Sequence, residues 1–207
     1  MMVNRFGKLA ALAIALTILA TSGCWGGGSS RVVPQSIAAD AAQKAMELYD
    51  TNHDGFLDEK ELEKVPGLAA AKKQVDTNQD HKISAEEIAA RIESWQQSKM
   101  GRIVLTCVVT HNGRPLPGAT VTLVPESFLG DQLTSGSGVT DSRGRAFIAE
   151  SANPPGLSPG FYRVQVTKAG EKIPAKYNTE TILGQEIGSE AAALNSDLGG
   201  PAFDLHY

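Results

Sequence analysis

The sequence predicts an α+β protein in two parts, a small all-α unit over residues 35–100 and an antiparallel β-sandwich over residues 101–207. Apolar residues recur at helical spacing in the first part and alternate at strand spacing from Gly101 onward. Glycine and proline, of which the chain has 21 and 10, fall mostly in the second part, as is typical of short strands joined by turns. Charge follows the same boundary, because residues 35–100 carry 13 acidic and 8 basic side chains, a net charge of −5.

Composition excludes several classes of protein. The chain has 207 residues and a formal net charge of −4, so it lacks the basic surface that neutralises phosphates in a nucleic-acid complex. Its two cysteines are too few for a disulfide-dense secreted scaffold or a four-cysteine zinc site. Apart from one early apolar run, no stretch predicts a membrane span. We therefore expect a globular protein with no nucleic-acid partner.

Residues 1–23 have the features of a signal peptide. Arg5 and Lys8 make its beginning positive, and residues 9–20 form an apolar run that is too short to span a bilayer comfortably. Residues 24–34 are rich in glycine and serine and are predicted to be a tether. Export is therefore expected.

The segment Thr21-Ser22-Gly23-Cys24 resembles the lipobox of bacterial lipoproteins, although the family usually has an aliphatic residue in place of Thr21. The resemblance implies that Cys24 is lipidated and anchors the protein to a membrane of the cell envelope. The alternative is a plain secretory signal, and only then is a disulfide between Cys24 and Cys107 open. Cys107 alternates with apolar residues, so we expect it to be a buried structural cysteine.

Residues 50–61 have the spacing of a calcium-binding loop. A hard cation takes six to eight oxygen ligands, which alternate residues of a tight loop supply, and Gly55 at position 6 allows the sharp turn. The ligand positions of the twelve-residue EF-hand loop are occupied by Asp50, Asn52, Asp54, Phe56 (through its backbone carbonyl), Asp58 and Glu61. We therefore predict a calcium site in this loop.

Residues 76–87 repeat the pattern with the same Asp-Thr-Asn opening. His81 replaces the glycine of position 6, at some conformational cost. The predicted ligands are Asp76, Asn78, Asp80, Lys82 (through its backbone carbonyl), Ser84 and Glu87. The first loop has four carboxylates at ligand positions and the second has three, so we expect two calcium sites, the first of them tighter.

The two loops together argue against other interpretations of the acidic residues. Acidic clusters are often only solvated surface, but two copies with the same opening and a closing glutamate make coincidence unexpected. Dockerins also pair two such loops, usually with aspartate at position 12, so Glu61 and Glu87 argue against a dockerin. Leu57 and Ile83, at position 8 of each loop, are predicted to pair. Pro66-Gly67 is predicted to break the chain between the loops.

The second part resembles the carboxypeptidase regulatory-like, or transthyretin-like (prealbumin-type), domain. The resemblance rests on residues 112–121, 140–144 and 159–164, where strand patterns adjoin glycine and proline turns. Residues 173–178 and the late Phe203-Asp204-Leu205 are similar to small lipoproteins of planctomycete-type bacteria. The resemblance implies a prealbumin-like sandwich of seven strands and brings no catalytic residue with it.

Two stretches of the second part are not predicted to be strands. Residues 135–138 are expected to form a glycine-rich loop. Residues 184–188 depart from the family, which usually has an alternating strand there, so the pairing of the last strand stays open.

No set of residues predicts catalysis. Transthyretin-like hydrolases use histidines and a C-terminal Tyr-Arg-Gly-Ser, whereas this chain ends in Asp-Leu-His-Tyr, and its histidines are isolated in sequence. We therefore expect a non-enzymatic, calcium-binding, lipid-anchored protein of the cell envelope, in which calcium orders the EF-hand unit. The alternative is a surface module whose sandwich binds a glycan or an envelope protein, with calcium purely structural. A calcium sensor is disfavoured, because neither entering helix has a methionine-rich face.

Overall fold

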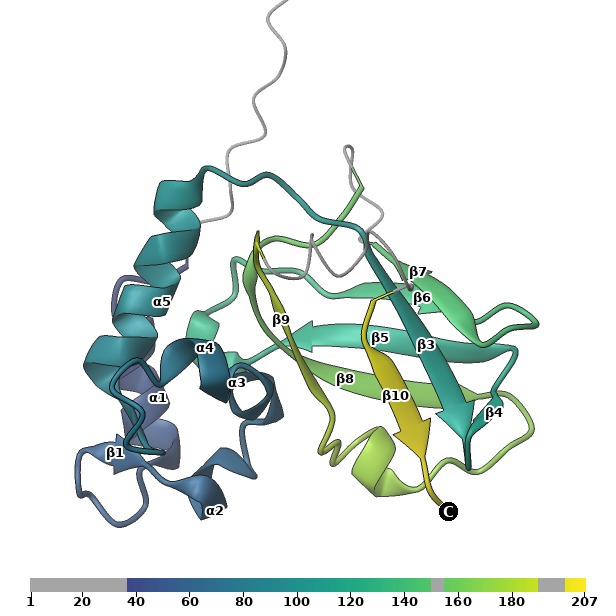
Figure 1. Cartoon of the computed structure of the whole chain (residues 1–207), viewed down its shortest axis with the longest axis horizontal. Coiled ribbons are helices and arrows are strands. Elements are labelled where there is room, and N and C mark those ends of the chain that lie inside the picture. Colours follow the sequence, from purple (N-terminus) through teal and green to yellow (C-terminus); the bar gives the residue numbers. More distant parts are fainter. Residues whose placement is uncertain (1–36, 150–154, 190–199) are drawn as a thin grey trace, which may run out of the picture. The chain divides into compact units, whose positions relative to one another are not determined.

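The computed structural model describes residues 37–149, 155–189 and 200–207, which belong to one compact unit. The predicted signal peptide, the tether and Cys24 lie outside the described residues. Among the helices of these ranges, none is long and apolar enough to cross a membrane. Helices form the first part of the unit and mainly antiparallel strands the second, so the architecture is α+β, as the change in hydrophobic spacing predicts (Figure 1).

Short helices and a two-stranded ribbon make up the first part. In chain order they are α1 (Ala41–Tyr49), β1 (Phe56–Leu57), α2 (Glu59–Leu62), α3 (Pro66–Ala70), α4 (Lys72–Val75), β2 (Ile83–Ser84) and α5 (Ala85–Ser98). The predicted break between the loops is present but lies at residues 63–65, between α2 and α3, and Pro66 and Gly67 already belong to α3. Proline is suited to the first position of a helix, where the N–H it lacks would have no partner and its fixed φ is helical.

Two four-stranded sheets make up the second part within the described residues. Their strands are β3 (Leu105–His111), β4 (Arg114–Pro115), β5 (Ala119–Pro125), β6 (Gly136–Val139), β7 (Arg145–Ile148), β8 (Gly160–Lys168), β9 (Gly184–Ile187) and β10 (Ala202–Leu205). In the first sheet β3 pairs with β10, β4 and β7, and the second has the order β6-β5-β8-β9.

Two predictions about the strands are wrong, and the pairing of the last strand, which the sequence left open, is parallel. Strand β10 pairs parallel with β3, because an alternating pattern fixes which face a side chain takes but not the direction of its strand. The expected loop at 135–138 lies largely in β6, where the small size of Gly138 allows close approach to the backbone of Phe147. Residues 184–187 form β9, although they do not alternate regularly, because β8 supplies their hydrogen bonds.

The two sheets share one hydrophobic core. It contains Cys107 of β3, which is free and fully buried as predicted, and burial raises the pKa of its thiol to about 12. Both sheets contribute, through Leu105, Val109, Ala146, Ile148 and Leu205 on one side and Val121, Leu123, Tyr162, Val164 and Val166 on the other.

A second core joins the helices to the sheets. Its members from the first part include Leu57, Leu68, Ile83, Ile88 and Trp95, and its members from the second part are Phe128, Leu129, Leu133 and Phe161. The ring of Phe161 packs edge-on against Trp95 with centroids 4.7 Å apart. Strand β8 therefore serves both cores, since Phe161 packs against the helices and the next residue, Tyr162, belongs to the core between the sheets.

Helix α3 approaches the second sheet at backbone distance. A Cβ atom on Gly184 of β9 would lie 1.8 Å from the carbonyl oxygen of Pro66, and one on Gly67 would lie 2.7 Å from the backbone nitrogen of Tyr162. Both distances are far shorter than a van der Waals contact. Only glycine fits at these two positions.

A buried carboxyl group also attaches α3 to the sheet. Glu126, just after β5, is 1% exposed, and its Oε1 accepts a hydrogen bond from the N–H of Gly67 at 2.8 Å. Burial raises the pKa of Glu126 to about 7, although this hydrogen bond and the positive charge of Arg163 act in the opposite direction. The sheet thus satisfies one of the N–H groups that α3 leaves without a helical partner.

Candidate metal centre

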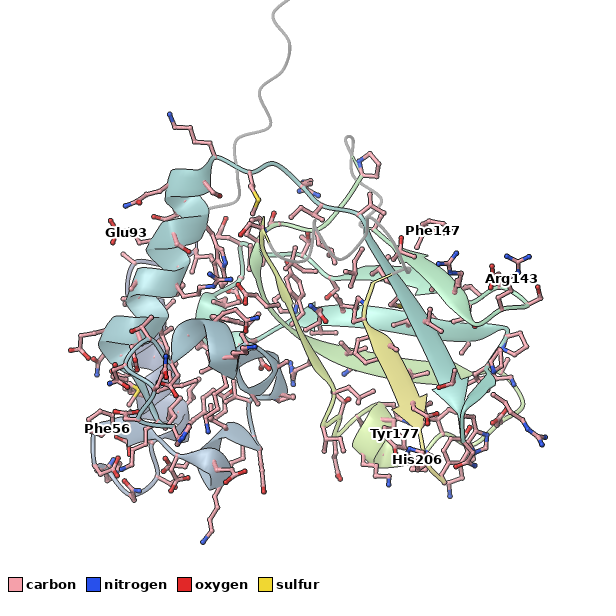
Figure 2. All side chains as sticks on the ribbon, in the orientation of Figure 1. Phe56, Glu93, Arg143, Phe147, Tyr177 and His206 are labelled. Carbon is pink, nitrogen blue, oxygen red and sulfur yellow. The ribbon has the colours of Figure 1, made fainter. Side chains whose placement is uncertain are left out.

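The two predicted loops lie side by side through their short strands. Strands β1 and β2 are antiparallel, with Leu57 opposite Ile83 and Phe56 opposite Ser84. This register confirms the predicted pairing at position 8. Leu57 and Ile83 are also fully buried. This ribbon fixes the two loops relative to each other, and Phe56, labelled in Figure 2, marks its place.

Position 1 of each loop has an oxygen without a hydrogen-bond partner. One oxygen, Oδ2, of Asp50 accepts the N–H of Gly55, and Oδ2 of Asp76 accepts that of His81, both at 3.0 Å. The other oxygen, Oδ1, is buried and has no hydrogen-bond partner in either residue. A buried, unpaired carboxylate oxygen is costly unless a cation or water satisfies it. Both loops therefore present an oxygen suited to a cation.

Position 6 has the same backbone conformation in both loops. Gly55 has φ of 85° and His81 has φ of 68°, the left-handed region that glycine adopts freely and other residues adopt at a cost. The second loop thus reaches the required turn without glycine. His53 and Gln79, at position 4 of each loop, also have positive φ.

The closing glutamates reach back across their loops. Glu61 accepts hydrogen bonds from the N–H of Thr51 at 2.7 Å and of Asp58 at 3.0 Å, and Glu87 accepts those of Thr77 and Ser84, both at 3.0 Å.

These hydrogen bonds favour the ionised form of both glutamates. Burial alone would raise the pKa of Glu61 and of Glu87, but the hydrogen bonds outweigh it and lower the pKa of each. The hydroxyls of Thr51 and Thr77 also donate to them. The threonine shared by the two loop openings is therefore a signal in the sequence for a hydroxyl that holds the closing glutamate.

The remaining predicted ligands are held by local hydrogen bonds. Asn52 and Asn78, at position 3, accept the N–H groups of Asp54 and Asp80. At position 9, Asp58 and Ser84 begin the helices α2 and α5 as reciprocal caps with the closing glutamates. The backbone carbonyls predicted at position 7 belong to Phe56 of β1 and to Lys82, just before β2.

The sequence predicted a role for the backbone carbonyl of Lys82 but none for its side chain. Its ammonium group lies 2.9 Å from Oδ2 of Asp54, a predicted ligand of the other loop, and 5.2 Å from the centre of the Phe56 ring. The hydrogen bond from Lys82 is the main cause that lowers the pKa of Asp54. A cation in the first loop therefore competes with Lys82 for this carboxylate.

In the part of the chain that the structure describes, no three His, Cys, Asp or Glu side chains converge closely enough to hold a metal ion. In the first loop, Asp54 is directed to Lys82, Asp58 caps α2 and Glu61 is held by backbone N–H groups. The loops have the ligand types and turns that suit calcium, together with the unpaired oxygens of Asp50 and Asp76. Binding therefore requires these carboxylates to exchange some hydrogen bonds for the cation.

Comparison with known proteins supports the assignment of the first loop. The family model described as EF hand matches residues 42–66, which run from α1 through the first loop to Pro66. No curated protein matches the chain. The chain thus contains an EF-hand, a helix–loop–helix unit whose loops typically bind calcium.

Replacing Lys82 by methionine is expected to tighten calcium binding in the first loop about threefold, because the ammonium group no longer competes for Asp54. The backbone carbonyl at this position is retained. Titration calorimetry in a Glu87→Gln background isolates the first loop. Lys64→Met removes an exposed charge from the same unit and is expected to have no effect, so an equal gain in both variants would show a general charge effect instead.

Proposed function

We propose that the chain is a calcium-binding protein without catalytic activity, exported and anchored to the cell envelope by a lipid on Cys24. The observation that carries the calcium assignment is the buried, unpaired Oδ1 of Asp50 and Asp76 at position 1 of both loops. The EF-hand match over residues 42–66 supports it independently.

We assign calcium a structural role, in which it orders the helices against the sheets. In sensor EF-hands calcium exposes an apolar groove for a partner. Here Phe128, Leu129, Leu133 and Phe161 of the second part already occupy the apolar side of the helices. The packing therefore supports a calcium-bound unit that stabilises the contact between two parts of one chain. It does not support a groove that opens to a second protein.

Titration calorimetry of the metal-stripped full chain, with magnesium present, tests the calcium assignment. Two binding events are expected, of which Glu61→Gln removes the tighter and Glu87→Gln the weaker, because the closing glutamate supplies both carboxylate oxygens. Glu63→Gln, an exposed position just after α2, is the matched control and should leave both events intact. Absence of heat at millimolar calcium would contradict the assignment.

The fold of the second part supports the likeness to a prealbumin-type sandwich. Two four-stranded sheets with one shared core agree with that architecture, while the parallel pairing of β10 is a departure from it.

The proposed anchor is tested by membrane fractionation. Cys24→Ser should move the protein to the soluble fraction, and retention in the membrane would contradict a lipid on Cys24.

A binding role for the sheets is the second candidate. Val139 of β6 and Phe147 of β7 are 63% and 69% exposed, unusual for large apolar side chains, and they lie on neighbouring strands (Phe147 is labelled in Figure 2). A glycan array probed with the full chain and with its Phe147→Ser variant tests this role. A signal that is equal in both would contradict binding at this surface.

A further inference from the structure

A buried ion pair joins the helix that leaves the second loop to the sheet. The carboxylate of Glu186, in β9, accepts hydrogen bonds at Oε1 from Nε of Arg91 at 2.7 Å and from the indole N–H of Trp95 at 2.9 Å. The terminal nitrogen Nη2 of Arg91 also lies 2.7 Å from Oε1 of Glu186. The side chains of Arg91 and Glu186 are 14% and 9% exposed, so water screens this pair weakly.

The ion pair belongs to a larger contact between α5 and the sheet. Glu186 lies directly opposite Phe161 in the pairing of β8 with β9, and Phe161 packs edge-on against Trp95. Arg91 and Trp95 are four residues apart, one turn of α5. Glu186 and Phe161, which face each other across two strands, therefore contact Arg91 and Trp95 of α5. These contacts fix where the guanidinium group of Arg91 lies.

The same helix begins with a calcium ligand. Glu87, position 12 of the second loop, precedes Arg91 by four residues, the spacing at which a glutamate and a following basic residue attract each other on a helix. Glu87, Arg91 and Thr77 line one cavity of about 140 Å³. A guanidinium group released from Glu186 therefore has room and a carboxylate within reach, and that carboxylate is the one the cation needs.

We propose that Glu186 is a positioning residue for the second calcium loop, which holds the guanidinium group of Arg91 against the sheet and away from Glu87. This inference rests on the proposed calcium-binding function. The sheet thereby regulates calcium affinity through charge.

The test measures calcium binding by the second loop in a full-chain Glu61→Gln background, where the first loop contributes no heat. Glu186→Gln keeps the shape of the side chain but removes its charge, and it should weaken binding about threefold to tenfold. Adding Arg91→Gln to Glu186→Gln should restore the parent affinity. Arg91→Gln alone should not weaken binding, and Glu180→Gln, an exposed position, is the charge-matched control.

Two results would overturn the inference while the proposed function stands. One is parent-like binding in the Glu186→Gln variant. The other is equal weakening by Arg91→Gln alone, because the contact would then matter only as packing. A parent protein that binds no calcium would instead overturn the function of the second loop, and the inference with it. Near-ultraviolet circular dichroism checks that each variant keeps its tertiary packing.

Discussion

Replacing Gly184 by alanine is expected to lower the free energy of unfolding by about 3 kcal/mol, the upper part of the range for inserting an atom into a packed interior. The new Cβ would lie 1.8 Å from the carbonyl oxygen and 2.2 Å from the carbonyl carbon of Pro66. Both are backbone atoms, so no side-chain rotation relieves the overlap, and α3 must move away from β9. Urea denaturation followed by circular dichroism measures the loss.

Gly101→Ala is the matched control for this substitution. A Cβ atom at Gly101 meets nothing within 4 Å, so alanine there should change stability by no more than about 0.5 kcal/mol. Equal stability of the Gly184→Ala variant and the wild type would show that α3 does not rest on β9 in solution.

Calcium is expected to raise the stability of the whole chain by about 5 kcal/mol when its free concentration is a hundred times the dissociation constant of both sites. Seven carboxylates occupy ligand positions in the two loops, and without the cation they repel one another. For a chain of this size the gain corresponds to a rise in melting temperature of roughly 10–20 °C. Differential scanning calorimetry with calcium and with a chelator measures it.

The variant Glu61→Gln/Glu87→Gln provides the control for this effect. It lacks both closing ligands, so its melting temperature should be the same with calcium and with chelator. Magnesium should give a much smaller rise, because it demands a smaller, octahedral site. Equal melting of the wild type with and without calcium would contradict an ordering role for the cation.

The two predicted loops were the most predictable part of the molecule. The spacing of Asp50, Gly55 and Glu61 is a local property, and the backbone conformation follows from residues that lie within twelve positions of each other. The paired strands at Leu57 and Ile83 follow from the repetition of the loop. Even the left-handed backbone of His81 is implied by its place at position 6.

The contact between helices and sheets was not predictable from the sequence. Phe161 has the pattern of an ordinary strand residue, and nothing near it in sequence indicates that it packs on Trp95, 66 positions earlier. Glu186 lies in a stretch without clear alternation, and a glutamate in a strand normally indicates a solvated face. Its burial depends on Arg91 and Trp95, partners that only the folded chain brings to it.

The position of β8 between two cores bears on how this chain folds and how it could be divided. The hydrophobic core of the helices is complete only when Phe161 of β8, more than sixty residues after Trp95, packs against them. Strand β8 must therefore first pair with β5 in the sheet. Assembly of the calcium-binding half thus depends on contacts that are distant in sequence, which are slow to form. A fragment ending at residue 100 would expose the indole ring and the surrounding aliphatic surface to water. The change of pattern at Gly101 therefore marks a change of secondary structure. It is not a boundary at which the chain could be cut to give an independently folding domain.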